Sequence, residues 1–360
     1  MAAVHEERRE RLRRLMREGR LDALLVAKPA NRYYLSGFEL HDTQCDESSG
    51  LLVVAADGRD WLATDARFSE AAEGLWDGGR ILVYGQDRHK GIAELLRNCG
   101  GRIGFEEDVL TCEFARHLAN SAHGVALEGR KGLVESLRKI KDPLELEAIA
   151  RSYALNHRLM AEVGSWLVPG RSEGEIVWAI ERFFRENGAS ELAFPSIVAV
   201  DANAAMPHAL PGSTPVSPSG MVLVDAGCRL DDYCSDQTRT FWVGETGGAG
   251  HDRFRRLLDL VQKAQRAAID GMRPGMKGRD VHGLAMKVFE EAGEGEAFTH
   301  SLGHGVGLQT HEQPSLSVNS DQVLEPGMVV TVEPGLYHPG WGGLRWEHAV
   351  VVEADGARVL

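Results

Sequence analysis

The chain has 360 residues, 43% of them hydrophobic and 26% charged, so it is long enough to bury a sizeable core without disulfides. At about 150 residues per domain, this length favours two domains. The net charge of −13 argues against a nucleic-acid partner, which requires a basic patch or stripe.

Residues 1–20 are dense in arginine and glutamate and contain no apolar segment of the kind found in signal peptides. No apolar run reaches the roughly 20 residues of a transmembrane helix, so we expect no membrane partner. The cysteines are odd in number and show no CxxC spacing, which favours free thiols in a reducing compartment. The sequence therefore predicts a cytoplasmic protein with five small, buried thiols: Cys45, Cys99, Cys112, Cys228 and Cys234.

Short apolar segments alternate with helical ones in the first part of the chain. Gly, Asp, Lys and Pro residues flank the apolar segments, as is typical of strands. This alternation predicts an α/β domain. Its strands are expected at 23–27, 51–55, 61–64, 81–84 and 102–105, and its helices at 8–19, 67–75 and 91–98.

The pattern changes in the charged stretch 129–141. We place the domain boundary there, between a domain of residues 1–132 and a domain of residues 133–360. The second domain groups several helices beside strands, which favours an α+β architecture. Its helices are expected at 143–164, 172–187, 251–271 and 278–292, and its strands at 196–200, 221–226, 233–243, 328–332 and 348–352.

The first two of these helices begin at capping boxes. Asp142 and Glu145 have the required spacing, with Pro143 at the first helical position. Ser172 and Glu175 repeat the signal. Both starts are therefore marked by the sequence itself.

Four carboxylates in the second half of the chain lie at or beside apolar, strand-like runs. Asp225 and Glu333 end such runs, Glu347 lies beside a third, and Asp236 stands eleven residues after Asp225. A carboxylate at the buried end of a strand is costly unless it is paired or bound to a metal. One alone is usually a capped turn or a salt bridge, but four in one half of a chain indicate a site.

His304 has glycine at positions 303, 305 and 307, which allows close backbone approach and leaves the imidazole open to a site. The alternative is a glycine-rich turn with an exposed histidine. A nucleotide loop is disfavoured, because GxGxxG lacks its third glycine and no GK[ST] follows. His311-Glu312 lacks the second histidine of HExxH, and the chain has no GxSxG nucleophile elbow.

These residues form a ligand set of four carboxylates and one imidazole. Such ligands, with no thiolate, suit Mn, Fe, Co or Zn. Four carboxylates exceed what one divalent ion needs, but they can bridge two. Two-metal sites, with ions about 3.5–4 Å apart, activate a water for hydrolysis.

In this order the residues resemble the pita-bread metallopeptidases: methionine aminopeptidase, aminopeptidase P (Xaa-Pro aminopeptidase) and prolidase. Segments 203–209, 235–240 and 343–347 are similar to the aminopeptidase P and prolidase branch. Segments 31–38 and 138–145 look like the creatinase-type N-terminal domain and its linker. The resemblance covers nearly the whole chain. It implies an α/β N-terminal domain, an α+β pita-bread domain and, by analogy, a homodimer.

The resemblance also implies two divalent ions, Mn foremost, with Co, Zn or Fe as alternatives. Asp225 would chelate one ion, and Asp236 and Glu347 would bridge both. His304 would complete the coordination of one ion and Glu333 that of the other.

Four residues would act in catalysis. Glu333 would accept the proton of the bridging water, and His311 would stabilise the tetrahedral oxyanion. His208 would contact the scissile amide or the leaving group, unless it is simply a capped loop histidine. Arg345, two positions before Glu347 and so on the same strand face, would steady the ligand carboxylates, unless it forms a simple salt bridge.

Three positions depart from the family pattern. Val200-Asp201 stands where many relatives have Ser-Gly, so the pocket rim is expected to differ. Ser315 stands where some prolidases carry arginine, and His348 follows Glu347 where many members have aspartate. None of these removes a ligand, and together they favour aminopeptidase P over prolidase.

The leading expectation is a dinuclear-metal hydrolase that cuts the bond between an N-terminal residue and proline in short proline-containing peptides. The alternatives are a prolidase acting on Xaa-Pro dipeptides, a hydrolase or lyase of the same fold acting on a small metabolite, and a non-catalytic binding module. Cleavage of Xaa-Pro-Xaa against Xaa-Pro separates the first two. Metal analysis tests the non-catalytic binding module, which predicts that no metal is bound.

Overall fold

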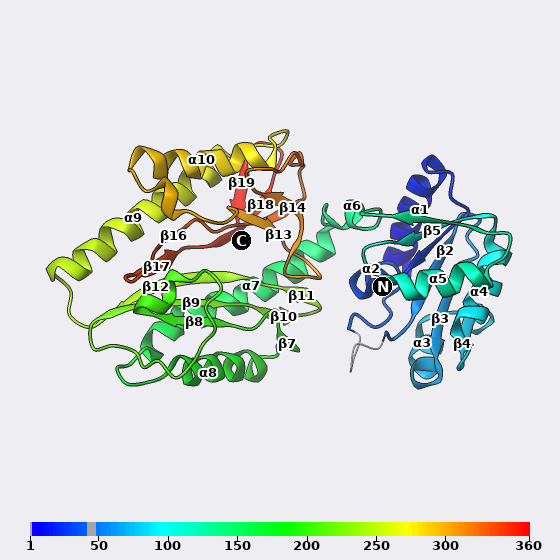
Figure 1. Ribbon diagram of the computed structural model, residues 1–360, viewed down its shortest axis with the longest axis horizontal. Helices are drawn as coiled ribbons and strands as arrows, with labels where there is room; N and C mark the ends of the chain where they lie inside the picture. Colours follow the sequence, from blue (N-terminus) through cyan, green and yellow to red (C-terminus); the bar gives the residue numbers. More distant parts are fainter. Residues whose placement is uncertain (1, 42–47) are drawn as a thin grey trace. The chain divides into compact units, whose positions relative to one another are not determined.

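The computed structural model describes residues 2–41 and 48–360, so the thiol predicted at Cys45 lies outside the described residues. The chain divides into two compact units, Met1–Arg138 and Lys139–Leu360 (Figure 1). The boundary expected from the charge pattern stands six residues before this division. Within the described ranges, no helix is long and apolar enough to cross a membrane.

The first unit is built on a six-stranded sheet with the order β4-β3-β2-β1-β5-β6. The central strand β2 runs antiparallel to β1 and β3, and the other neighbours are parallel. This mixed sheet with helices between its strands confirms the α/β prediction. The strands are β1 (Ala23–Val26), β2 (Leu51–Ala55), β3 (Trp61–Asp65), β4 (Ile81–Tyr84), β5 (Arg102–Glu106) and β6 (Ala126–Arg130).

Two helices of the first unit differ from the prediction, because their buried faces contain polar side chains and so lack the apolar spacing that marks a helix in the sequence. The first helix begins at Ala2, not at residue 8, because its early turns bury polar side chains: His5 and Arg8 both bond to the carbonyl oxygen of Tyr34. A helix that the sequence left unassigned begins at Pro29, and most of its residues are buried. The helices are α1 (Ala2–Glu18), α2 (Pro29–Ser36), α3 (Ser69–Leu75), α4 (Arg88–Cys99), α5 (Cys112–Ser121) and α6 (Glu135–Arg138).

The second unit contains two layers of helices packed on sheets (Figure 1). Helices α7 (Pro143–Val163) and α8 (Glu173–Glu186) pack around one apolar core on a three-stranded sheet. Its order is β12 (Gln237–Val243), β9 (Gly220–Ala226) and β8 (Ile197–Val200). Helices α9 (Gly248–Gly271) and α10 (Gly278–Glu291) pack on the sheet β14-β13-β15-β18-β19 around another. Both predicted capping boxes, at α7 and α8, are present.

One long predicted strand, 233–243, is divided in two. The break falls at Ser235 and Asp236, where the Ser235 N–H donates to the Cys228 carbonyl oxygen. The strands of this unit are β7 (Glu191–Leu192), β8 (Ile197–Val200), β9 (Gly220–Ala226), β10 (Cys228–Leu230), β11 (Tyr233–Cys234), β12 (Gln237–Val243), β13 (Gly303–Gly305), β14 (Glu312–Leu316), β15 (Val329–Val332), β16 (Gly335–His338), β17 (Gly342–Arg345), β18 (His348–Val352) and β19 (Ala357–Val359).

Replacing Asp142 with alanine is expected to lower the free energy of unfolding by about 1 kcal/mol, because the helix α7 loses its N-cap. Asp142 Oδ1 accepts the Glu145 N–H at 3.0 Å, and Glu145 Oε2 accepts the Asp142 N–H at 3.0 Å. Leu144→Ala, at an exposed position of the same turn, is the control and should change stability by less than about 0.5 kcal/mol. Urea denaturation measures both, and equal effects would contradict the capping role.

Candidate metal centre

Strand alternation brings Asp225 to the site. Val222 and Val224 on β9 pack in the core under α7 and α8, whereas Leu223 packs in a separate cluster with residues of β8 and the loop after it. Because successive side chains of a strand point to opposite faces, Asp225 projects on the same face as Leu223, away from these helices. Asp236 immediately precedes β12, the antiparallel neighbour of β9.

The five-stranded sheet contributes His304 and Glu333. Thr331 joins them, since its Oγ1 accepts the His304 N–H at 3.1 Å and donates to Glu333 Oε1 at 3.2 Å. A Cβ on Gly303 would lie 2.0 Å from the carbonyl oxygen of Thr331, and one on Gly305 would lie 2.3 Å from a carbonyl oxygen of β14. Glycine at these two positions therefore lets β13 fit between its neighbours.

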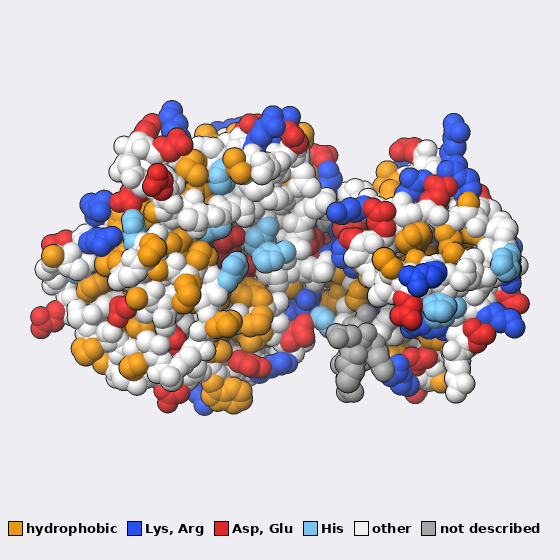
Figure 2. All heavy atoms as spheres, in the orientation of Figure 1, with side chains coloured by type: hydrophobic (Ala, Val, Ile, Leu, Met, Phe, Trp, Pro, Cys, Tyr) orange, Lys and Arg blue, Asp and Glu red, His pale blue; other side chains and the backbone are white. Residues whose placement is uncertain are grey.

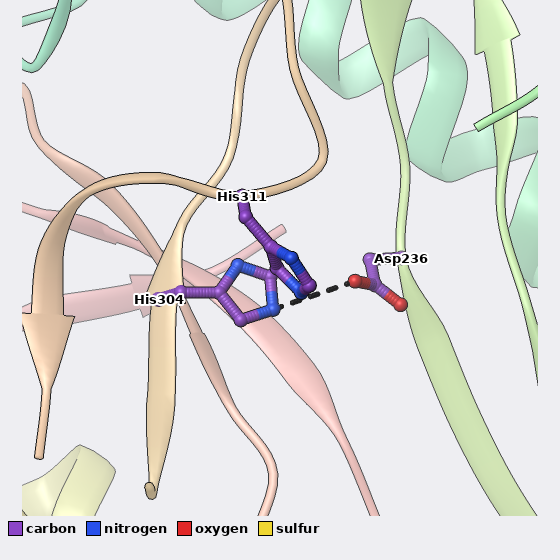
Figure 3. Close-up of side chains that lie close together, drawn as sticks. All are labelled: Asp236, His304 and His311. Atoms are coloured by element: carbon purple, nitrogen blue, oxygen red, sulfur yellow. Dashed lines mark ion pairs between the residues drawn. The ribbon is translucent and has the colours of Figure 1, made fainter. Parts of the chain in front are cut away.

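Two overlapping groups of side chains have the spacing of metal ligands. The ligand atoms of Asp225, Asp236 and Glu347 lie within 4.8 Å of one another, and so do those of Asp236, His304 and His311 (Figure 3). Asp236 belongs to both groups. Asp225 Oδ1 and Glu347 Oε1 are buried and have no hydrogen-bond partner among the described residues. Buried carboxylate oxygens without donors fit a site for divalent cations.

His304 presents Nε2 to the carboxylates. Its Nδ1 lies 3.0 Å from the Gly305 carbonyl oxygen, and Nε2 lies 3.5 Å from Asp236 Oδ2 and 3.3 Å from Glu333 Oε1. An imidazole whose other nitrogen bonds to a backbone carbonyl is typical of metal ligands. The ring of His311 meets that of His304 edge-on, with 4.1 Å between centroids (Figure 3).

The carboxyl groups of the site differ in the direction of their pKa shifts. Burial raises the pKa of Asp236 and Glu347, and repulsion from neighbouring carboxylates raises both further. Burial also raises the pKa of Asp225, although the charge of Arg345 opposes the shift. For Glu333, burial is outweighed by the hydrogen bond and charge of His304, so its pKa falls to about 2. Divalent cations would remove the repulsion among the first three groups.

Arg345 connects two of the candidate ligands, Asp225 and Glu347. This buried guanidinium donates from Nη2 to Asp225 Oδ2 at 2.6 Å and from Nε to Thr238 Oγ1 at 3.0 Å. The Thr238 hydroxyl in turn donates to Glu347 Oε2 at 2.8 Å. Arg345 therefore forms a salt bridge with Asp225. It also contacts a second carboxylate, that of Glu347, indirectly through the Thr238 hydroxyl.

Sequence reasoning missed three members of this network. Thr238 stands two residues after Asp236, and this period-two spacing was the available signal. Arg345 Nη1 also donates to the Tyr337 hydroxyl at 2.8 Å, and that hydroxyl lies 3.0 Å from His300 Nε2. His300 and Tyr337 carry no comparable signal, because they meet only in the folded chain.

The centre opens into a cavity of about 510 Å³. Asp225, Asp236, His304, His311, Glu333 and Arg345 all contribute to its lining. His208 lines it as well but is exposed. Figure 2 shows histidine side chains gathered on this face of the second unit. The cavity is otherwise lined mainly by apolar side chains, among them Phe194, Pro195, Ile197, Leu210 and Pro211.

Comparison with known proteins identifies the family. Residues 147–354 match the model of metallopeptidase family M24, and residues 8–140 match the creatinase/prolidase N-terminal domain. The fold and the site together define a metallopeptidase, a hydrolase that uses divalent metal. The chain belongs to metallopeptidase family M24, which confirms the resemblance and the pita-bread fold inferred from the sequence.

Named relatives match over nearly the whole chain. The Xaa-Pro dipeptidase of Pyrococcus furiosus is 30% identical over 355 residues, which cover 99% of this chain and 97% of the relative. The structure of the Xaa-Pro dipeptidase from Bacillus anthracis matches with a TM-score of 0.91 and 33% identity, covering 99% of this chain and 97% of that one. The X-Pro aminopeptidase from Thermotoga maritima matches with a TM-score of 0.84 and 28% identity, covering 95% and 97%.

Asp236→Asn is expected to raise the free energy of unfolding of the chelator-treated protein by about 1–2 kcal/mol at pH 7, because the neutral amide does not repel Glu347 and Asp225. The pKa of Asp236 is raised in the folded state, so its ionisation destabilises the fold as pH rises above the ordinary carboxyl range of about 4. The advantage of the variant should therefore disappear near pH 4. Urea denaturation at both pH values measures it.

The same variant should lose most of the rise in melting temperature that Mn²⁺ gives the wild type. Asp270→Asn, at an exposed position of α9, is the control and should keep that rise unchanged. Destabilisation by Asp236→Asn at pH 7 in chelator would contradict the assignment of uncompensated repulsion to this site.

Proposed function

We propose that this protein is a divalent-metal-dependent Xaa-Pro dipeptidase, a prolidase, which hydrolyses the bond between an N-terminal residue and proline in dipeptides. The observation that carries the hydrolase part is the pair of ligand groups that share Asp236 beside a cavity of about 510 Å³. The substrate part is supported by relatives named Xaa-Pro dipeptidase at 30–33% identity over nearly the whole chain.

The sequence alone favoured an Xaa-Pro aminopeptidase and kept the dipeptidase as its alternative. The names of the relatives support the alternative better. The match to the X-Pro aminopeptidase from Thermotoga maritima keeps the longer substrate as the second candidate. In either case the substrates are short proline-containing peptides.

Two divalent ions would be held by five residues: Asp225, Asp236, His304, Glu333 and Glu347. Among Mn, Co, Zn and Fe we favour Mn, because four of these ligands are carboxylates. When bound, the ions supply an acidified water and polarise the substrate carbonyl.

The protein side chains divide the remaining work. We assign proton acceptance to Glu333, which is supported by its place in the cavity lining, with its Oε1 3.3 Å from His304 Nε2. His311 meets the charge that develops on the carbonyl oxygen; burial and the neighbouring His304 lower its pKa, so its neutral ring can donate an N–H there. Arg345 orients Asp225, and His208 contacts the scissile amide or the leaving group.

The cavity walls suit a proline ring. A proline amide has no N–H, so the ring must be recognised mainly by shape and apolar contact. Phe194, Ile197 and Pro211 supply apolar surface in the lining. This supports a substrate whose distinguishing feature is a compact apolar ring.

The proposal includes a cytoplasmic homodimer. Among the described residues four cysteines are free, in keeping with a reducing compartment: Cys99, Cys112, Cys228 and Cys234. Of these, Cys228 and Cys234 are buried, Cys99 is half-buried and Cys112 is exposed, so the expectation of buried thiols is wrong for Cys112 and Cys99. The homodimer rests on the family resemblance.

With Mn²⁺ bound, the protein is expected to cleave Ala-Pro with a kcat/KM at least about tenfold above that for Ala-Pro-Ala, a discrimination of roughly 1.4 kcal/mol. Ala-Ala is the control for the proline requirement. Product release is measured by chromatography. Cleavage of the tripeptide alone would establish the aminopeptidase instead, and cleavage of neither by metal-loaded protein would contradict the peptidase function.

His311→Ala is expected to lower kcat by roughly 10²–10³-fold, because one donor to the developing oxyanion is lost, while KM and metal content stay near the wild-type values. His123→Ala, at an exposed position of the first unit, is the control. Steady-state kinetics and elemental analysis measure both effects. If the metal content falls in parallel with kcat, His311 is a metal ligand and the oxyanion role is wrong.

A further inference from the structure

Residues 200–212, here called the pocket loop, form one wall of the cavity. The loop leaves β8 at Val200 and carries His208 and Leu210 into the cavity lining. Leu210 is 89% exposed, the highest value among the large apolar side chains of the described residues. Side chains this exposed gain little from packing, so the backbone of the loop must determine where they stand.

A single buried carboxylate holds both ends of this loop. Glu173, the first residue of α8, is 1% exposed. Its Oε1 accepts the Val200 N–H and Asn203 Nδ2, each at 2.9 Å, and its Oε2 accepts the Gly212 N–H at 2.9 Å. Val200 and Gly212 are the first and last residues of the loop, so the Glu173 carboxylate links its two ends. Backbone contacts also hold them, since the Gly174 N–H donates to the Gly212 carbonyl oxygen at 3.0 Å and Val200 pairs with Val222 of β9.

The surroundings of Glu173 offset the cost of burying its carboxylate. The N-terminus of an α-helix favours negative charge, and Glu173 begins a helix of 14 residues. Three N–H donors satisfy its two oxygens, and hydrogen bonds to a charged group are among the strongest in proteins. Glu173 therefore needs no cation to hold the loop.

Separate contacts fix the loop relative to the metal ligands. Asp201 adopts a φ of 48°, a conformation that Asp tolerates better than most residues, and its Oδ1 accepts the Met221 N–H of β9 at 2.9 Å. Arg345 Nη1 donates to the Pro207 carbonyl oxygen at 3.2 Å. Arg345 also binds Asp225, so it connects the middle of the loop to the candidate metal centre. The ends of the loop are bound by Glu173.

We propose that Glu173 is the positioning residue for the substrate side of the site. Its carboxylate sets the position of the pocket loop, and through it of His208 and Leu210, without taking part in metal binding. The inference rests on the proposed function, since it takes the cavity as the place where the peptide binds. It assigns Glu173 to the substrate side alone, whereas Arg345 contacts both the loop and Asp225.

Glu173→Gln tests this at constant side-chain volume. Glutamine keeps one oxygen as an acceptor but presents an NH₂ group to the remaining donor, so at least one end of the loop loses its hydrogen bond. KM for Ala-Pro is expected to rise roughly tenfold or more, with a smaller fall in kcat because His208 moves with the loop. Metal content and the Mn²⁺-induced rise in melting temperature should equal those of the wild type.

Glu175→Gln is the matched control. Glu175 lies on the same turn of α8 and is exposed, and its side chain completes the capping box with Ser172, which glutamine also does. This variant loses the same charge at the same helix end, but no bond to the pocket loop. Its KM and kcat should match those of the wild type.

Hydrogen–deuterium exchange gives a readout that does not depend on activity. The amides of Val200 and Gly212 should exchange faster in Glu173→Gln than in the wild type or in Glu175→Gln. Should Glu173→Gln fail to fold, Asn203→Ala removes one of the three bonds and should shift KM in the same direction by a smaller factor.

Wild-type KM together with wild-type exchange in Glu173→Gln would overturn the inference. So would a fall in metal content accompanied by a loss of kcat at constant KM, since Glu173 would then support the metal centre. If metal-loaded wild type cleaves no Xaa-Pro substrate, the proposed function fails, and the exchange data still decide whether Glu173 holds the loop.

Discussion

The mutual repulsion of Asp225, Asp236 and Glu347 is the constraint on which the rest of this structure depends. Three buried carboxylates within ligand distance of one another would oppose folding unless positive charge compensates them. The protein supplies only part of that charge, through Arg345. Two carboxylate oxygens have no hydrogen-bond donor among the described residues, and a bound cation placed there would supply the remaining positive charge. This imbalance of charge is what makes the three carboxylates a candidate metal centre.

The two layers of the second unit hold these groups in place without joining the centre. Helices α7 and α8 stabilise the sheet that carries Asp225, while α9 and α10 stabilise the sheet that carries Glu333 and His304. Each candidate ligand lies on or next to a strand, and rigid elements position site residues more precisely than loops do. The pocket loop is the exception. It contributes side chains to the cavity, its Gly212 N–H donates to Glu173, its Asp201 accepts the Met221 N–H, and its Pro207 carbonyl oxygen accepts from Arg345.

The predictable parts of the molecule are those with a local signal. The capping boxes at Asp142 and Ser172 and the strand leading to Asp225 are visible in a few consecutive residues. Thr238 and Glu347, by contrast, are 109 residues apart, and Arg345 and Asp225 are 120 apart. Glu173 was invisible for the same reason, because a helix-starting glutamate is an ordinary surface residue until its partners are known. The split at Asp236 shows the converse, since uniform strand propensity concealed a break between β11 and β12 at a candidate metal ligand.

Titration of Mn²⁺ into the chelator-treated protein, followed by calorimetry with elemental analysis of the product, tests the central claim most directly. The account predicts saturable binding of two ions per chain, lost in Asp225→Asn, because removing one carboxylate leaves the site short of charge and of a ligand. The contrary result is an absence of saturable binding, or binding that Asp225→Asn leaves unchanged. Either would mean that these buried carboxylates are not a metal centre.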